Sequence, residues 1–248
     1  RSGGSATRSC RKVIYKKEIR LMKKISVAID GPAGAGKSSV AKTAASVLGY
    51  VYIDTGAMYR SVAVYGIQNG IDIAGERQRL IKCLGDIDIS LRNDGGRQTV
   101  YLNDVDVTER IRTADASMGA SAVAVIPEVR EKLVSEQKAM ARDGGVIMDG
   151  RDIGTSVLPG AELKIYLTAS VAERAKRRYN ENIERGMECD YDEIERDVRK
   201  RDENDMTREV SPLRKADDAV LLDTSDMTFD EVVGAVTDMI REREADVL

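Results

Sequence analysis

The chain contains 248 residues, of which 42% are hydrophobic and 33% are charged, and it carries a formal net charge of −3. This composition suits one large α/β domain or a core with a smaller insert, and it excludes a membrane-spanning protein because no apolar run approaches the roughly 20 residues that a span requires. The small negative net charge provides no overall field to attract nucleic acid. The three cysteines are odd in number and share no metal-ligand spacing, so we expect a reduced, cytoplasmic protein.

Histidine is absent from the whole chain. Mechanisms that need a histidine base, a histidine metal ligand or a Ser-His-Asp triad are therefore excluded. A transfer between phosphate groups is compatible with this absence. A phosphate monoester has a second pKa of about 6, so it is largely a dianion at pH 7 without help from a base.

Residues 1–21 form a basic segment with seven Lys or Arg against one Glu. They show no hydrophobic periodicity and no apolar stretch typical of a secretory signal. We interpret them as a disordered extension outside the fold, which precedes a natural start at Met22. The alternative is a basic arm that binds nucleic acid.

The first predicted strand covers residues 25–30, and the helix after the next loop covers 37–48. Glycines in the loop let successive N–H groups face phosphate oxygens, and the helix adds the positive end of its dipole. Lys37 can reach the β- and γ-phosphates, and the Ser38 hydroxyl can hold Mg²⁺. A chance glycine turn is the alternative. We predict a triphosphate-binding loop with these residues: Gly31, Pro32, Ala33, Gly34, Ala35, Gly36, Lys37, Ser38 and Ser39.

Four further short apolar runs alternate with helical patterns, at 50–54, 146–149, 163–167 and 219–222. This order predicts a doubly wound parallel sheet covered by helices on both faces. Ser170 and Thr228 each precede a Glu by three residues, as in a capping box at the start of a helix. The last helix has one apolar face that we expect to be core, made of Phe229, Val232, Val233, Val236, Met239 and Ile240.

Residues 86–107 break this order, because apolar and polar residues alternate with period two around a Gly pair. The pattern predicts a small antiparallel sheet, which with a helix over 56–68 would form a separate lobe. We therefore expect an α/β core that starts at 22–54, an insert at 55–112, and a return to the core over 113–248 with a short lid around 174–208.

Charged residues follow the predicted strands, at the edge where open α/β sheets bind ligands. Arg60 closes a polar turn after the second strand, and Arg151 follows the third; planar guanidinium groups suit bidentate phosphate contacts. Asp149 directly follows an apolar strand, as an acid near Mg²⁺ or substrate would, although a helix cap is the alternative. More arginines crowd the later helices: Arg174, Arg177, Arg178, Arg201 and Arg208. Arg177 or Arg178 alone would more often be a solvated helix face than a catalytic residue.

From residue 22 to 248 the chain resembles the bacterial cytidylate kinases, a family of nucleoside monophosphate kinases with the P-loop NTPase fold. The motifs that carry the resemblance are GPAGAGKSS at 31–39, YIDTGAMYR at 52–60, DVTE with IR at 106–112, PEVR at 127–130, DGRDIGT at 149–155, LKIYLTAS at 163–170, ERAKRR at 173–178, RD at 201–202 and SPL at 211–213. The resemblance implies transfer of the γ-phosphate of ATP to CMP or dCMP with Mg²⁺, in pyrimidine nucleotide metabolism. It also implies a monomer that binds neither nucleic acid nor membranes, and an insert that binds the monophosphate.

The resemblance also implies roles for individual residues. Cytosine would be recognised by Ser121, Arg130 and Asp152, and its N4 amino donor does suit a carboxylate. The acceptor phosphate would contact Arg60, Arg151 and Arg208, the ribose would contact Arg201 and Asp205, and the acceptor site would be lined by Thr55 and Tyr59. The transferring phosphoryl would be neutralised by Lys37, Arg151, Arg177 and Arg178, with Arg174 also at the lid, and the metal would lie at Ser38 and Asp149.

Two rival hypotheses stay open. One is a kinase for another monophosphate, such as UMP or AMP. The other is a regulatory P-loop module that binds nucleotide without transfer, which the arginines disfavour because a binder has no need to neutralise a transferring phosphoryl. One departure from the family pattern is Leu158-Pro-Gly160, where an aromatic-Pro-Asp sequence is expected.

Overall fold

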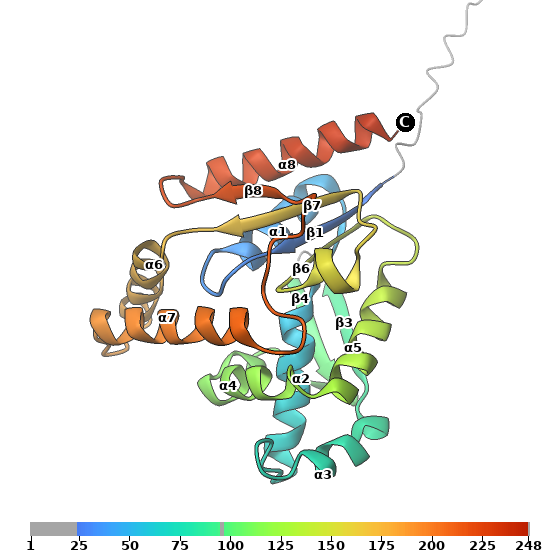
Figure 1. Ribbon diagram of the computed structural model, residues 1–248, viewed down its shortest axis with the longest axis vertical. Helices are drawn as coiled ribbons and strands as arrows, with labels where there is room; N and C mark the ends of the chain where they lie inside the picture. The colour runs from blue at the N-terminus through green and yellow to red at the C-terminus, as the bar shows by residue number, and fades with distance from the viewer. Residues whose placement is uncertain (1–23, 95–96, 248) are drawn as a thin grey trace, which may run out of the picture.

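A five-stranded parallel sheet forms the centre of the computed structural model, which describes residues 24–94 and 97–247 (Figure 1). Its strand order is β2-β6-β1-β7-β8, and all four pairings are parallel. The strands are β1 (Ser26–Asp30), β2 (Val51–Asp54), β6 (Val146–Gly150), β7 (Leu163–Thr168) and β8 (Val220–Asp223). The predicted doubly wound sheet is confirmed, with strand bounds within one residue of the expected ones. The extension assigned to residues 1–21 lies outside the described residues.

Helices cover both faces of this sheet because successive side chains of each strand point to opposite sides. Val27 and Ile29 of β1 pack in one buried cluster with α1 (Lys37–Leu48) and α8 (Phe229–Asp246). Ala28, between them, packs on the other side with the π-helix η3 (Ile153–Val157) and the segment just after α5 (Pro127–Met140). The central strands are therefore buried on both faces, as their continuous apolar runs predict.

The apolar stripe of α8 is core for five of the six residues named from the sequence. Val232, Val236 and Ile240 are buried, and Val233 and Met239 pack against the same cluster. Phe229 is 48% exposed, so its assignment to the core was wrong. Phe229 is the first residue of the helix, directly after the capping box of Thr228 and Glu231, and the stripe meets the sheet only from the next turn onward.

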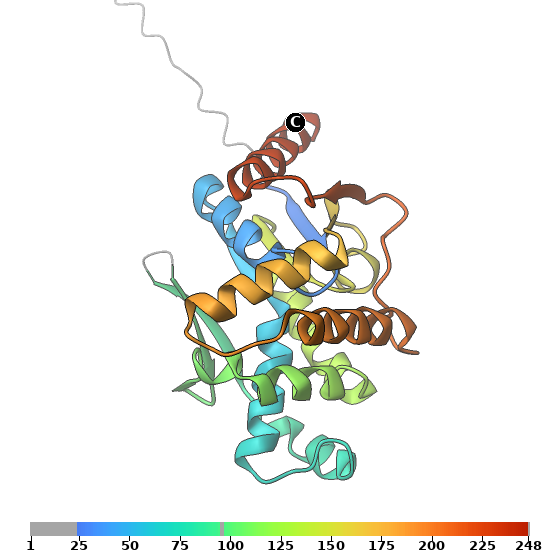
Figure 2. The same ribbon diagram turned by 90° about the vertical axis from the view of Figure 1, so that its left-hand side faces the viewer.

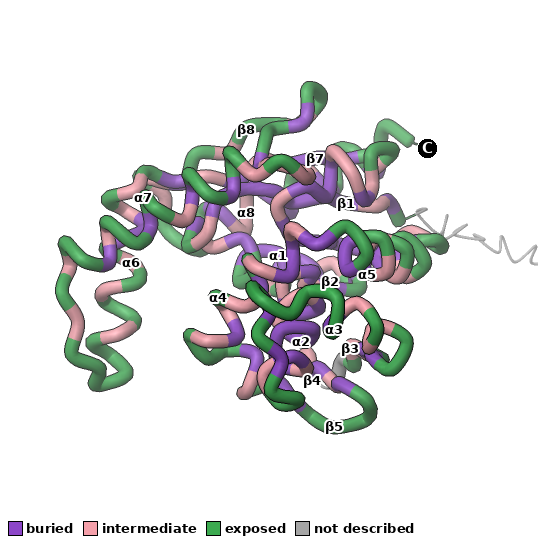
Figure 3. The backbone as a smooth tube through the Cα atoms, turned by 60° about the horizontal axis from the view of Figure 1, so that its bottom comes forward, coloured by how far each residue is buried: buried purple, intermediate pink, exposed green. Residues whose placement is uncertain are grey.

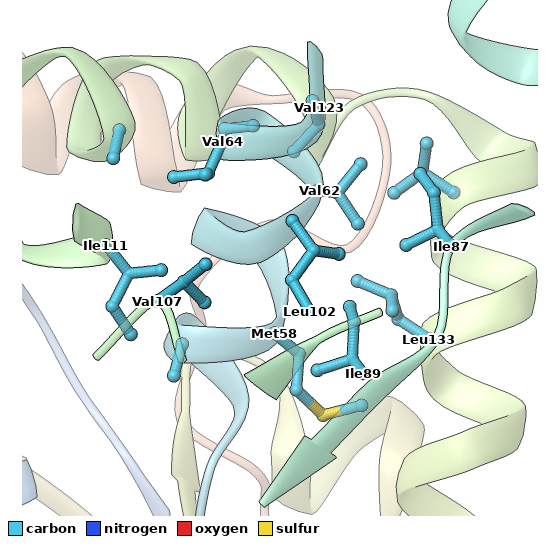
Figure 4. Close-up of a cluster of buried hydrophobic side chains, with 14 of the residues drawn as sticks. Met58, Val62, Val64, Ile87, Ile89, Leu102, Val107, Ile111, Val123 and Leu133 are labelled. Carbon is cyan, nitrogen blue, oxygen red and sulfur yellow. The ribbon is translucent and has the colours of Figure 1, made fainter. Parts of the chain in front are cut away.

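A second lobe is built on α2 (Thr55–Gln68) and a small antiparallel sheet of β3 (Ile89–Asp94), β4 (Arg97–Leu102) and β5 (Val105–Asp106). The predicted hairpin is confirmed, while its turn at 95–96 lies outside the described residues. Figure 4 shows the lobe's core, where side chains of α2 and the small sheet meet residues of α4 (Ala114–Val123) and α5. The division at residues 55 and 112 stays a prediction. The remaining short helices here are α3 (Arg77–Lys82), η1 (Leu84–Asp86) and η2 (Arg110–Arg112).

Helices α6 (Val171–Glu184) and α7 (Tyr191–Thr207) form a hairpin that projects to one side of the sheet (Figures 1 and 2). A small apolar cluster, with Ala175, Ile194 and Val198 buried, packs between the two helices, and Arg174 of α6 also pairs with Asp202 of α7. Figure 3 shows that most of the hairpin's outer surface is exposed. Within the described part of the chain, no helix combines the length and apolarity that crossing a membrane requires.

Candidate active site

A cavity of about 490 Å³ lies at the carboxyl edge of the sheet, where the P-loop, α2, α4, α6 and α7 meet. Seven cationic and five acidic side chains line it. This excess of positive charge suits a ligand that carries phosphate groups. The lining groups are Lys37, Arg60, Arg130, Arg151, Arg177, Arg201 and Arg208, with Asp54, Asp149, Asp152, Glu181 and Asp205.

The predicted phosphate loop forms one wall of this cavity. Gly31 has φ +148°, and a Cβ added there would lie 1.9 Å from the carbonyl oxygen of Leu167, so the position requires glycine. Gly36, with φ +89°, sets the first turn of α1. The loop residues on the wall are Ala33, Gly34, Gly36, Lys37, Ser38 and Ser39. The other three predicted residues, Gly31, Pro32 and Ala35, are buried behind them.

Lys37 is buried with its Nζ donating to the carbonyl oxygen of Pro32 at 2.6 Å. Burial is the main reason that the pKa of Lys37 falls to about 7, and nearby Arg151 acts in the same direction. Asp149 and Asp30 oppose that shift. Because negative charge favours the ammonium form, phosphate groups in the cavity would keep Lys37 charged.

Asp149 is held at both carboxylate oxygens by hydroxyl groups. The hydroxyl of Ser38 donates to Oδ2 at 2.7 Å and that of Tyr52 donates to Oδ1 at 2.9 Å. Burial, followed by the nearby Asp54 carboxylate, raises the pKa of Asp149 to about 6. Its partners are side chains rather than the N–H groups of a helix end, which argues against the helix-cap alternative. A hydroxyl beside a buried carboxylate is an oxygen donor set that fits Mg²⁺.

Asp30 is a buried carboxylate that connects the end of β1 to the segment after β6. It ends β1 just before the phosphate loop, and its carboxylate accepts from the backbone N–H groups of Ile153 and Gly154 at 2.8 and 2.7 Å. Burial raises its pKa to about 6 despite these two hydrogen bonds. The contact fixes the turn that carries Arg151 and Asp152. The sequence interpretation gave Asp30 no role, because its partners are more than 120 residues away.

The opposite wall of the cavity is built around Asp152. Its Oδ2 lies 2.5 Å from the guanidinium of Arg130 in a buried ion pair, and its Oδ1 lies 3.8 Å from that of Arg208. Arg130 also donates to the hydroxyl of Tyr59 at 3.2 Å. Ser121 of α4 lines the same cavity. The structure therefore brings together the predicted base-recognition residues.

Two more arginines predicted for the acceptor phosphate line the cavity, each paired with a carboxylate. Arg151 donates from Nε to Asp205 at 2.8 Å. Arg60 donates to Asp54 at 2.9 Å, and the other oxygen of Asp54 caps α2 through the N–H of Ala57. An anion that entered here would meet arginines already held in place.

The three arginines of α6 that were predicted to lie at a lid occupy three different environments, which the sequence could not distinguish. Arg174 is buried and forms a bidentate pair with Asp202 of α7, at 2.9 and 2.6 Å, so it does not face the cavity. Arg177 lines the cavity and is held by Glu173 and the carbonyl oxygen of Thr224. Arg178 is exposed on α6 and lies outside the cavity lining.

A comparison with family models finds the cytidylate kinase model over residues 27–242. The chain belongs to the cytidylate kinase family. It is 51% identical to the cytidylate kinase of Caldicellulosiruptor bescii over 88% of this chain and 96% of that protein. The cytidylate kinase of Anoxybacillus flavithermus is 50% identical over 89% and 98%. A solved shikimate kinase from Acinetobacter baumannii matches with a TM-score of 0.43 and 15% identity, over 89% of this chain and 95% of that chain.

The resemblance to cytidylate kinases that the motifs indicated is thus confirmed. Within this family member, several cavity residues had no predicted role: Asp54, Gly56, Ser117, Ala120, Ala124, Gly150 and Glu181. Ser117 carries a signal that could have revealed it, because it precedes Ser121 by one helical turn on α4. Asp54 lies in the YIDTGAMYR motif, but the motif alone does not reveal that Asp54 pairs with Arg60. That pairing requires the first turns of α2, which bring the two side chains together.

The buried pair of Arg174 and Asp202 is expected to stabilise the junction between α6 and α7 in this cytidylate kinase family member. Arg174 also donates to the carbonyl oxygens of Ala169 and Ala33, so one guanidinium joins the residue after β7, the P-loop and α7. We expect Arg174→Met to lower the free energy of unfolding by about 3–5 kcal/mol, because Asp202 would keep a buried charge without its partner. Urea unfolding measures this.

The double variant Arg174→Met/Asp202→Leu should recover part of the loss, since it removes both charges. If the free energy of unfolding of Arg174→Met lies within about 0.5 kcal/mol of the wild-type value, as for an ordinary surface substitution, the pair does not stabilise the junction of α6 and α7.

Proposed function

We propose that this chain transfers the γ-phosphoryl group of ATP to the phosphate of CMP or dCMP, giving ADP and CDP or dCDP. The observation that carries the proposal is one cavity with cationic groups on two walls. The P-loop with Lys37 forms one wall, and the arginines around Asp152 form the other. Membership of the cytidylate kinase family supports cytidine monophosphates as the acceptors.

On the donor side, backbone N–H groups of the P-loop and the start of α1 would bind the β- and γ-phosphates. Lys37 would turn from the carbonyl of Pro32 to these phosphates and offset the charge that develops on them. Ser38 and Asp149 would hold Mg²⁺, which when bound neutralises charge on the β- and γ-phosphate oxygens. Arg177 would approach the same phosphates from α6.

On the acceptor side, a phosphate oxygen of CMP would attack the γ-phosphorus in line, and the bond to the bridging oxygen of ADP would break. No base is required, because the acceptor phosphate is already a dianion near pH 7. Arg60, Arg151 and Arg208 would orient that phosphate, with Thr55 and Tyr59 beside it. Asp152 would accept from the cytosine amino group, with Arg130 and Ser121 at the other base atoms.

An assay of ADP release with CMP, dCMP, UMP, AMP and GMP as acceptors tests the proposal. We expect rapid ADP release with CMP and dCMP and slow release with the other three. Equal or faster release with UMP or AMP would identify a kinase for another monophosphate. ADP release with none of them, combined with tight ATP binding, would instead support a regulatory module.

Asp205 provides a test of the ribose contact proposed for it and Arg201. We expect Asp205→Ala to reduce kcat/KM for both substrates, because Arg151 loses its partner, but to reduce it more for CMP than for dCMP. The 2′-hydroxyl of CMP would lose an acceptor in a closed site, at a cost of about 1–3 kcal/mol, whereas dCMP never made that bond. Equal fold-losses for the two substrates would leave Asp205 with only the role of holding Arg151.

The remaining assignments rest on the resemblance and on composition. We infer a cytoplasmic monomer that uses Mg²⁺ and binds neither nucleic acid nor membranes. Arg178 would reach the transferring phosphoryl only if α6 moved toward the cavity, since it is exposed outside the lining.

A further inference from the structure

Tyr52 contacts the candidate metal acid but has no part in the function proposed above. Its side chain is 7% exposed on β2, and its hydroxyl donates to Oδ1 of Asp149 at 2.9 Å. The other oxygen, Oδ2, accepts from the Ser38 hydroxyl at 2.7 Å. One oxygen of the carboxylate is thus held by a strand, and the other faces the P-loop helix.

The sheet register produces this contact. Tyr52 pairs with Ile147 and Asp54 pairs with Asp149 across β2 and β6. Since side chains alternate along a strand, Tyr52 and Asp149 project from the same face of the sheet, on neighbouring strands and two residues apart in register. A rigid element therefore supports the carboxylate, which favours a fixed orientation over one set by a mobile loop.

Tyr52 also joins the main sheet to the small one. The side-chain amide of Gln98 on β4 donates to the backbone carbonyl oxygen of Tyr52 at 2.7 Å. The same residue therefore contacts the small sheet through its backbone and the candidate metal acid through its side chain.

We propose that Tyr52 is a positioning residue, whose hydroxyl fixes the rotation of the Asp149 carboxylate so that Oδ2 stays beside Ser38. This inference rests on the proposed function, because it takes Ser38 and Asp149 as the residues that hold Mg²⁺ with ATP. Without the hydroxyl, Oδ1 would lose its donor in a buried site and the carboxylate could turn about its Cβ–Cγ bond. Residues that orient a metal ligand in this way commonly change metal affinity or activity by about 10- to 100-fold when they are removed.

Tyr52→Phe removes only the hydroxyl and keeps the ring in the core. MgCl₂ is titrated at a fixed ATP concentration without CMP, and the melting temperature is measured at each point. The Mg²⁺ concentration that gives half of the maximal rise in melting temperature is the Mg²⁺ midpoint. A second titration follows ADP release with CMP present. We expect both midpoints to rise by about tenfold in Tyr52→Phe, while the effect of ATP alone in EDTA stays unchanged.

Tyr50→Phe is the matched control, because Tyr50 is equally buried just before β2 and its hydroxyl also donates to a buried carboxylate, that of Glu244, at 2.6 Å. That contact lies at the far end of the strand from Asp149. We expect Tyr50→Phe to lower the melting temperature without moving the Mg²⁺ midpoint. A similar shift of the midpoint in both variants would show general loosening of the sheet and would overturn the proposal.

The variant Asp149→Asn tests whether the Tyr52 hydroxyl affects the Mg²⁺ midpoint through the Asp149 carboxylate or by another route. If Tyr52 acts through Asp149, adding Tyr52→Phe to Asp149→Asn should move the Mg²⁺ midpoint by less than about twofold. A midpoint in Tyr52→Phe within about twofold of the wild type would overturn the proposal, as would a full tenfold effect in the Asp149→Asn background.

Absence of CMP phosphorylation by the wild type would count against the proposed function alone, since the stabilisation by Mg²⁺ and ATP is measured without CMP.

Discussion

Lys37→Ala is expected to lower kcat for CMP phosphorylation by at least about a thousandfold, equivalent to about 4 kcal/mol of transition-state stabilisation. Lys37 is the one lysine among the described residues that line the cavity, and it lies in the wall that would hold the β- and γ-phosphates. Loss of a positioned donor to developing negative charge commonly costs a hundredfold to a thousandfold, and here a full charge is removed as well. Steady-state ADP release measures the effect.

The fold should survive this substitution. Burial of the ammonium lowers the pKa of Lys37 to about 7, so its surroundings disfavour the charged form, and alanine removes that cost. Lys42→Ala is the matched control, because Lys42 is exposed on the same helix α1. It should retain full activity. Activity of Lys37→Ala within about tenfold of the wild type, a difference of roughly 1.4 kcal/mol, would show that the P-loop is not the donor site.

The donor wall could be predicted from the sequence because its chemistry is local. Eight consecutive residues between a strand and a helix specify the loop, the lysine and the Ser38 hydroxyl. The strands could also be placed to within one residue, since each is a short apolar run between helical patterns, and the three central strands β1, β6 and β7 are largely buried. In both cases the signal and the structure lie in the same stretch of chain.

The partners of the charged residues could not be predicted in this way. Arg174, Arg177 and Arg178 share one helix and one residue type, yet only the tertiary structure shows that Arg174 is paired with Asp202, which lies 28 residues further along. Likewise, the contact of Tyr52 with Asp149 joins residues 97 positions apart. Ion pairs and hydrogen bonds of this kind depend on strand register and helix packing, which composition and periodicity do not encode.

Asp152→Asn is expected to reduce the preference for CMP over UMP by about 10- to 100-fold, while binding of ATP changes little. A carboxylate only accepts hydrogen bonds and so suits the cytosine amino group, whereas an amide can also present a donor. Contacts that leave a polar group unpaired in a buried site cost about 1–3 kcal/mol, which sets this range. The measurement is kcat/KM for both acceptors, together with the KM for ATP.

Asp152 also forms ion pairs, so Asp152→Asn changes more than the contact with the base, and the control must remove the charge from a comparable ion pair. Arg130 would lose a charged partner at 2.5 Å, and Arg208 would lose a weaker one at 3.8 Å, so some loss of activity with every acceptor is expected. Asp115→Asn removes the charge from another Arg–Asp pair, with Arg110, at 2.6 Å, in a half-buried position outside the cavity lining. It should leave both the activity and the preference unchanged.

A uniform loss with CMP and UMP, at an unchanged ratio between them, would assign Asp152 the role of holding Arg130 and Arg208 rather than contacting the base. A loss of preference without change in the KM for ATP supports direct recognition of cytosine. The geometry favours direct recognition, because Asp152 lines the cavity itself and its Oδ1 lies 3.8 Å from the nearest guanidinium nitrogen of Arg208. At that separation Oδ1 retains the capacity to accept a hydrogen bond from an amino group.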